Sequence, residues 1–144
     1  MFVGKIYIHL IWTTNDHKKS LVNCKKQLGD YLMKYGESKD INIRIISVLA
    51  DHVHCIIRLN SIQSISDIVQ VLKGTSSQWL NKNVQLPYRF KWDDEYFAFS
   101  IGYSQLEEFK DYISAQPTYH QTKSLQEEIR AIQKKYHLKY LFET

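Results

Sequence analysis

Two histidines separated by one residue, His52 and His54, are the side chains whose types and spacing first suggest chemistry. In an extended strand, residues two apart point to the same face and lie about 6.5–7 Å apart, so two imidazoles can hold one metal ion. Such pairs also occur on strand surfaces that bind no metal. Here the apolar residues Val53 and Cys55 alternate with the histidines. A His-x-His pair is more often a surface or packing feature than a metal ligand, but packing gives no reason for imidazole on this polar face, and the alternation thus strengthens the metal interpretation.

A tyrosine and a glutamine four residues apart, Tyr112 and Gln116, form a second candidate pair. Residues at this spacing lie one turn apart on one face of a helix. That face is offset from the apolar stripe that begins at Leu106. A boundary tyrosine beside a surface glutamine has the same pattern. Pro117 disfavours helical geometry at the residue before it, so the helix is predicted to end or kink near Gln116.

Hydrophobic periodicity predicts the elements that must position these side chains. Alternation of period two predicts strands, and apolar stripes of period 3.6 predict helices. The predicted strands cover residues 2–12, 41–48, 51–59 and 96–102, and the predicted helices begin near residues 20, 64, 104 and 124. Gly36 is expected to stop the first helix, and Ser64 and Ser104 are expected to cap later ones. The βαββαβ order, with two further helices, predicts an α+β, ferredoxin-like antiparallel sheet in one domain, residues 1–144.

The two faces of this sheet are expected to differ. The helices are predicted to cover the face that bears the isoleucines of 41–48 together with Phe97 and Phe99. The opposite face is predicted to have no helical cover and to carry the polar side chains His9, His52, His54 and Arg58. An uncovered face with this many polar groups is a suitable ligand surface.

Charge, cysteines and hydropathy bear on the partners and the location of the protein. The 144 residues carry a formal net charge of +4, from 19 Lys and Arg against 15 Asp and Glu. The excess lies in the first 50 residues, which supports an anionic partner and equally fits a solvated basic surface.

Cys24 and Cys55 match no zinc spacing and fall on apolar stripes, so both are expected to be reduced core residues. No segment approaches the ~20 apolar residues that cross a bilayer, and the N-terminus alternates like a strand, so a cytoplasmic location is expected.

Together these motifs resemble a known family. A His-hydrophobic-His strand followed by a helical Tyr-x-x-x-Gln is similar to the pattern of the HUH single-strand nucleases. Finer motifs resemble the single-tyrosine transposases of the insertion-sequence-200/605 type, in the family's order: HLIWTT at 9–14, DHVH at 51–54, SISDIVQVLKGTSS at 64–77 and YISAQ at 112–116. Two features depart from that pattern. Tyr119-His120 stands where the family often has two histidines, and the cluster at 16–19, DHKK, is less rich in arginine.

The resemblance implies a chemistry for these residues. Tyr112 would be the nucleophile that cuts single-stranded DNA and forms a covalent 5′-phosphotyrosine, and a later 3′-OH would reverse the step and rejoin strands. His52, His54 and Gln116 would bind a divalent metal and leave sites for a phosphate oxygen and water. This mixed nitrogen and oxygen set suits Mg²⁺ or Mn²⁺.

The resemblance also implies partners. The substrate would be single-stranded DNA with hairpin ends, and the working unit a homodimer in which the tyrosine helix of one subunit reaches the histidines of the other. A hinge at Gly102 and an unpaired first or last strand would serve such a dimer. The candidate DNA contacts are Tyr7, His9, Lys18, Lys19, Arg58 and Lys73. Lys73 equally fits a helix interior, and Arg58 a solvated strand end.

Three other functions remain open from the sequence. The first is a ferredoxin-like module that binds single-stranded nucleic acid without cutting it. The second is a metal hydrolase with a water nucleophile, for which Asp51 is the only acid beside the histidines, although alternation points Asp51 to the core. The third is a domesticated nuclease of the same family that cuts repeats without moving an element.

Overall fold

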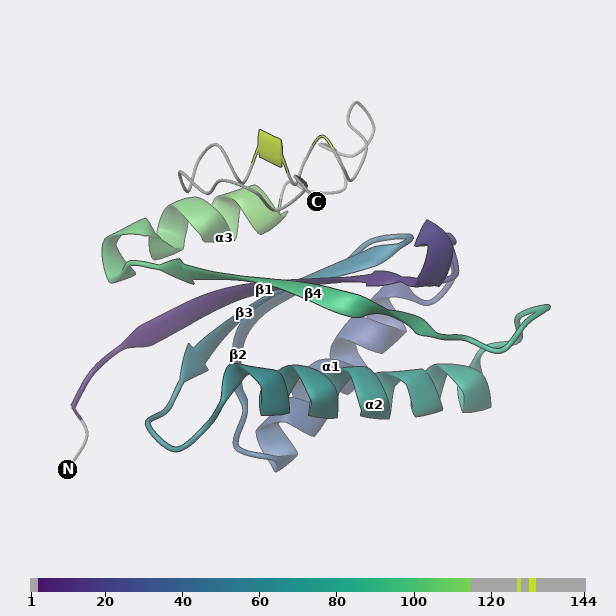
Figure 1. Cartoon of the computed structure of the whole chain (residues 1–144), viewed down its shortest axis with the longest axis horizontal. Helices are drawn as coiled ribbons and strands as arrows, with labels where there is room; N and C mark the ends of the chain where they lie inside the picture. The colour runs from purple at the N-terminus through teal and green to yellow at the C-terminus, as the bar shows by residue number, and fades with distance from the viewer. Residues whose placement is uncertain (1–2, 115–126, 128–129, 132–144) are drawn as a thin grey trace.

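The computed structural model describes residues 3–114, 127, 130 and 131. One sheet in the order β2-β3-β1-β4 forms its centre, and all neighbouring strands are antiparallel. The strands are β1 (Ile6–Thr14), β2 (Asn42–Val48), β3 (His52–Leu59) and β4 (Trp92–Ile101). The helices are α1 (Lys25–Ser38), α2 (Ile65–Asn83) and α3 (Leu106–Ser114) (Figure 1). This order confirms the predicted α+β, ferredoxin-like fold, and the helix predicted from residue 124 falls outside the described residues.

The main core lies between the sheet and the helices α1 and α2. Alternate residues of β1 and β3 and the apolar stripes of the two helices supply it, as the periodicity predicts. Its fully buried members include Leu10, Trp12, Val53, Cys55, Ile57, Leu28, Leu32, Leu72 and Leu80. Cys24 and Cys55 are free and buried, which confirms their prediction as reduced core residues, and burial raises the pKa of both thiols.

The other face of the sheet is covered by α3, which lies opposite α1 and α2 in Figure 1. Leu106 and Phe109 of α3 are buried against Tyr7, Ile56 and Ile101 of the sheet. The predicted absence of helical cover on this face is therefore wrong. The polar histidines share the face with enough apolar side chains to hold an amphipathic helix.

The strand register corrects the predicted faces of two further segments. Phe99 pairs with His9, and Phe97 pairs with Ile11, so both phenylalanines lie on the α3 side rather than on the α1 and α2 side. In β2, an irregularity between Ile43 and Ile45 moves Ile45 to the α3 side. Alternation sorts the residues of one strand into two sets, but only pairing with neighbouring strands says which face each set occupies.

The helix starts agree only partly with the sequence. Ser64 caps α2, because its hydroxyl accepts the backbone N–H of Asp67 at 3.1 Å, as predicted. At α3, a 3₁₀ turn at Tyr103–Gln105 precedes the helix, and the Gln105 side chain accepts the Gly102 N–H at 3.0 Å. The predicted cap at Ser104 is therefore replaced by a turn closed from Gln105.

Gly36 lies inside α1 and is buried, so its prediction as a helix stop is wrong. A Cβ at this position would lie 2.8 Å from the Ile43 Cδ1 and 3.2 Å from the Ile41 carbonyl oxygen. The glycine thus lets α1 approach β2 closely. Gly29 of the same helix differs, because its nearest contact would be the Val48 Cγ2 at 3.7 Å.

Gly36→Ala is therefore expected to unfold more easily than Gly29→Ala. Both variants gain the same helix propensity from alanine, but only Gly36→Ala forces atoms together, which costs about 1–3 kcal/mol of unfolding free energy. Urea unfolding of the two variants measures the difference. Equal midpoints would show that Ile43 moves aside without cost.

Candidate active site

The histidine pair sits at the start of β3 on the side covered by α3. His52 and His54 are 1% and 0% exposed, and their ring centroids are 5.0 Å apart. The predicted shared face is thus confirmed. The rings are close enough to ligate one ion together.

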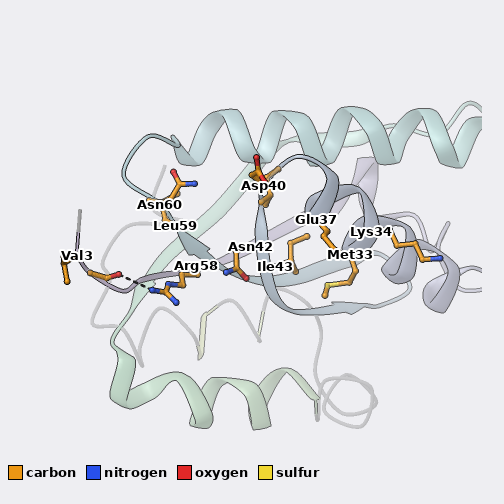
Figure 2. Close-up of a pocket in the computed structure, with 12 residues that line it drawn as sticks. Val3, Met33, Lys34, Glu37, Asp40, Asn42, Ile43, Arg58, Leu59 and Asn60 are labelled. Carbon is orange, nitrogen blue, oxygen red and sulfur yellow. Dashed lines mark hydrogen bonds between the residues drawn. The ribbon is translucent and has the colours of Figure 1, made fainter. Parts of the chain in front are cut away.

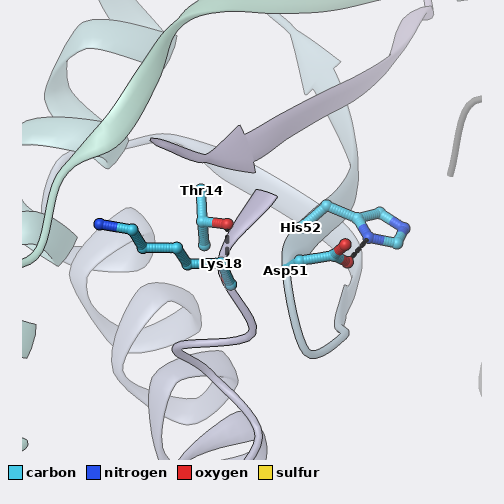
Figure 3. A network of polar contacts seen from close by, with 4 residues as sticks. All are labelled: Thr14, Lys18, Asp51 and His52. Atoms are coloured by element: carbon cyan, nitrogen blue, oxygen red, sulfur yellow. Dashed lines mark hydrogen bonds and ion pairs between the residues drawn. The ribbon is translucent and has the colours of Figure 1, made fainter. Parts of the chain in front are cut away.

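Asp51 is directed at the first of these rings rather than at the core. Its Oδ1 lies 2.7 Å from the His52 Nδ1 (Figure 3). The predicted orientation is wrong because Asp51 lies before the first residue of β3, and strand alternation does not extend to it. Its backbone carbonyl accepts a hydrogen bond from the Thr14 N–H. A carboxylate accepts a hydrogen bond from the Nδ1–H and directs coordination through Nε2, an arrangement common beside metal-binding histidines.

His9 has the corresponding place beside the second ring. Its Nε2 lies 2.9 Å from the His54 Nδ1, and its side chain is fully buried. The ring of Phe99 from β4 and the ring of Phe109 from α3 lie 6.2 Å and 6.0 Å from the His9 ring. His9 therefore joins the histidine pair to the packing of α3.

The predicted DNA contacts at Tyr7 and His9 are corrected by this packing. Tyr7 is 3% exposed beneath Leu106 and Phe109, and His9 is buried as described. In this arrangement neither ring offers a surface to a nucleic-acid strand. The prediction that both residues lie on the same face as the histidines is confirmed, but nothing in the sequence indicated that α3 would cover them.

Arg58 lies at the other end of β3 from His52, about 20 Å along the strand. Its guanidinium donates to the Gly4 carbonyl at 3.4 Å and lines a cavity of about 830 Å³ (Figure 2). Lys34, Glu37 and Asp40 line the same cavity. Because acidic and basic side chains both line this cavity, its charge does not favour binding of an anion such as DNA. The cavity is also remote from the histidines.

Lys73 is half-buried between α2 and β4. Its ammonium donates to the carbonyl oxygens of Asp93 and Glu95, and burial lowers its pKa. These bonds fasten α2 to the start of β4. These hydrogen bonds give the Lys73 side chain a structural role.

Lys18 and Lys19 are exposed in the loop after β1, where the sequence placed them. The structure brings two further basic residues, Arg89 and Lys91, to the same end of the sheet, because the Asn15 N–H donates to the Lys91 carbonyl at 3.0 Å. Sequence reasoning missed this second pair, since segment 83–95 has no periodicity. The basic residues on either side of the buried Phe90 are the signal that could have found them.

The predicted nucleophile lies near the end of the described segment 3–114, and the predicted third ligand lies beyond it. Tyr112 occupies the helical position one turn after Phe109 in α3, and Gln116 falls outside the described residues. Within the described part of the chain, no group of three or more His, Cys, Asp or Glu side chains could hold a metal ion. No helix in that part is long and apolar enough to cross a membrane.

Comparisons with known proteins place the chain in a family. The family model described as "Transposase IS200 like" matches residues 2–116. The ISDra2 transposase TnpA of Deinococcus radiodurans is 30% identical over 78 residues, which are 54% of this chain and 56% of that protein. The match thus spans little more than half of that relative.

Two solved structures share the fold. A putative transposase from Deinococcus radiodurans R1 has a TM-score of 0.65 at 24% identity, over 80% of this chain and 93% of that one. A REP-associated tyrosine transposase bound to a REP hairpin has a TM-score of 0.62 at 19% identity, over 83% and 70% of the two chains. Since the family model covers most of its length, the chain belongs to the family of IS200-like transposases.

Proposed function

We propose that this chain is a metal-dependent transposase that cuts and rejoins single-stranded DNA through Tyr112. The observation that carries the proposal is the buried pair His52 and His54, each held at Nδ1, on the sheet face against which the helix that contains Tyr112 packs. Two oriented imidazoles beside a nucleophile-bearing helix are suited to phosphoryl transfer, which depends on positioning and on charge stabilisation.

His52, His54 and Gln116 are the proposed ligands of a divalent cation, Mg²⁺ or Mn²⁺. The side chains present fit such an ion, because Asp51 and His9 engage the Nδ1 atoms and direct both histidines to coordinate through Nε2. Two imidazoles and an amide oxygen form a neutral nitrogen and oxygen set that suits Mn²⁺. When bound, the ion would offset charge on the phosphate oxygens.

Tyr112 would supply the nucleophile. A phenol attacks phosphorus as its phenolate, so Tyr112 must first lose its proton. A bond then forms between the tyrosine oxygen and phosphorus as the bond from phosphorus to the 3′ oxygen breaks. The leaving oxygen takes up a proton and becomes a 3′-OH. Attack by another 3′-OH on the phosphotyrosine reverses the step without ATP.

The structure bears on the alternative functions. A stacking module needs aromatic rings exposed on its central strands, whereas Tyr7 and His9 of the central strand β1 are buried here. A hydrolase with a water nucleophile is a closer competitor, because Asp51 contacts His52. It differs in its product, since it leaves no DNA attached to the protein. A domesticated nuclease would share the same site.

The deciding experiment is a search for the covalent product. The protein is incubated with Mn²⁺ and single-stranded hairpin DNA labelled at the 3′ end, and a protein-linked band is sought on a denaturing gel. A perfect duplex of the same sequence is the control and should give no such band. Free cleaved DNA without an adduct would favour the hydrolase.

The bond from His9 to His54 gives a prediction that does not depend on DNA. His9→Ala should weaken Mn²⁺ binding by about 10- to 100-fold, the usual effect of losing the partner of a metal-binding histidine. His9→Gln, which can still bond to the His54 Nδ1, should recover most of the affinity. Calorimetric titration measures both.

The matched control is Phe99→Leu, which disturbs packing beside His9 and removes no hydrogen bond. Its affinity for Mn²⁺ should remain close to that of the wild type. If His9→Ala binds Mn²⁺ as tightly as the wild type, His9 does not position His54. If the wild type itself binds no Mn²⁺, the metal-dependent function is wrong.

A hairpin substrate and a homodimer complete the proposal. The hairpin is supported by the REP-associated relative, whose solved structure is bound to a REP hairpin. The first or the last strand is expected to pair across the two subunits of a dimer. Because β1 is central in the sheet and β4 lies at its edge, β4 is the one of these two strands that can do so. The subunits would share active sites by exchange of α3.

A further inference from the structure

Four basic side chains from two distant segments gather at one end of the sheet. Lys18 and Lys19 follow β1, and Arg89 and Lys91 precede β4; all four are exposed. Backbone bonding from Asn15 to Lys91 holds the segments side by side. Together these four residues form the two-loop basic surface.

Several contacts make this surface a preformed unit. The Lys18 ammonium lies 4.3 Å from the centre of the Tyr88 ring, and the Tyr88 hydroxyl lies 2.6 Å from the Ser20 hydroxyl. The Thr14 hydroxyl donates to the Lys18 carbonyl at 2.6 Å. The two contacts of Tyr88 tie the first loop to the second, and the bond from Thr14 fixes the backbone within the first loop. A surface that is already ordered loses less entropy when a partner binds.

The four cations of this surface form no ion pair with an acid among the described residues. Asp16 lies in the first loop and Asp93 lies two residues after Lys91, and neither forms an ion pair with these four side chains. Gathering unpaired cations costs stability through repulsion, so the arrangement is suited to a polyanion.

The surface borders the histidine site without entering it. Thr13 pairs with His52, and the Thr14 N–H donates to the Asp51 carbonyl at 2.9 Å. Figure 3 shows the Lys18 side chain extending away from His52 on the other side of Thr14. A strand with one phosphate at the histidines would meet these cations where its neighbouring phosphates pass this end of the sheet.

We propose that the two-loop basic surface binds the backbone phosphates that flank the cleaved phosphate of single-stranded DNA. The inference rests on the proposed function and assigns a new role to Arg89 and Lys91. Because the contacts are to phosphates, they contribute affinity and register without reading sequence. Binding should therefore weaken with salt in proportion to the number of contacts.

The test compares salt dependence in two variants of equal charge. Arg89→Gln/Lys91→Gln removes two cations from the surface, and the control Lys34→Gln/Lys39→Gln removes two exposed cations at the far end of α1. Affinity for a fluorescent single-stranded hairpin oligonucleotide is measured from 50 to 200 mM salt. Each lost single-strand phosphate contact lowers the slope of log K against log salt by about 0.7, so Arg89→Gln/Lys91→Gln should lose about 1.4.

The control variant should keep the wild-type slope and should form the covalent adduct at the wild-type rate when DNA is saturating. Equal slopes in all three proteins would overturn the assignment of this surface. A loss of equal size in both variants would also overturn it, because net charge rather than position would then set the affinity. If the wild type does not bind the oligonucleotide, the proposed function fails before the surface is tested.

Discussion

Replacing Tyr112 by phenylalanine should abolish the covalent protein–DNA adduct and leave DNA and Mn²⁺ binding unchanged. The substitution keeps the ring and removes only the hydroxyl that would attack phosphorus. Loss of the nucleophile in a serine protease lowers kcat by about 10⁶-fold, so the adduct is expected to fall below detection on a gel. A 3′ end label follows the reaction, because that fragment carries the 5′ phosphate joined to tyrosine.

Tyr103→Phe is the matched control for this change. Tyr103 is exposed in the 3₁₀ turn before α3, and its ring lies 6.2 Å from the Tyr7 ring, so loss of its hydroxyl should leave the adduct intact. An adduct formed by Tyr112→Phe would show that another tyrosine attacks. Tyr119, which lies outside the described residues, would then be the first to change.

The sequence predicted the elements of this fold because their periodicity is local. The stripe of α2 and the Ser64 cap need only residues within a few turns of each other. The side of the sheet on which Phe99 lies depends on its pairing with His9, some 90 positions away in the chain. Gly36 illustrates the same limit, since its conformation is ordinary and only the approach of Ile43 explains it.

The candidate site divides in the same way. His52 and His54 were predictable because one strand carries both. The bond from His9 to His54 joins two strands and depends on their register. The contact between Asp51 and His52 was not predicted for a different reason: the predicted strand began at Asp51, one residue before β3 begins, so Asp51 was wrongly assigned to the core side.

The second large effect expected is complementation between two inactive variants. Within one chain, α3 packs over its own histidine face through Leu106 and Phe109. A second copy presents an identical face, so α3 can exchange between subunits and keep the same contacts, as in domain swapping. The short connection from Gly102 to Gln105 would open to permit this exchange. Tyr112 of one subunit would then lie over His52 and His54 of the other.

Tyr112→Phe and His54→Ala should each be inactive alone, since every site in either protein lacks one essential group. With exchanged helices, a mixed dimer has one site with both groups intact and one with neither. Random mixing makes about half of the dimers mixed, so activity should return to about a quarter of the wild-type level. With helices kept in their own chains, both sites of a mixed dimer lack a group and activity stays at zero. Adduct formation after subunit exchange, with mixed dimers verified by mass spectrometry, separates these two arrangements, and a protein that sediments as a monomer would exclude the shared site.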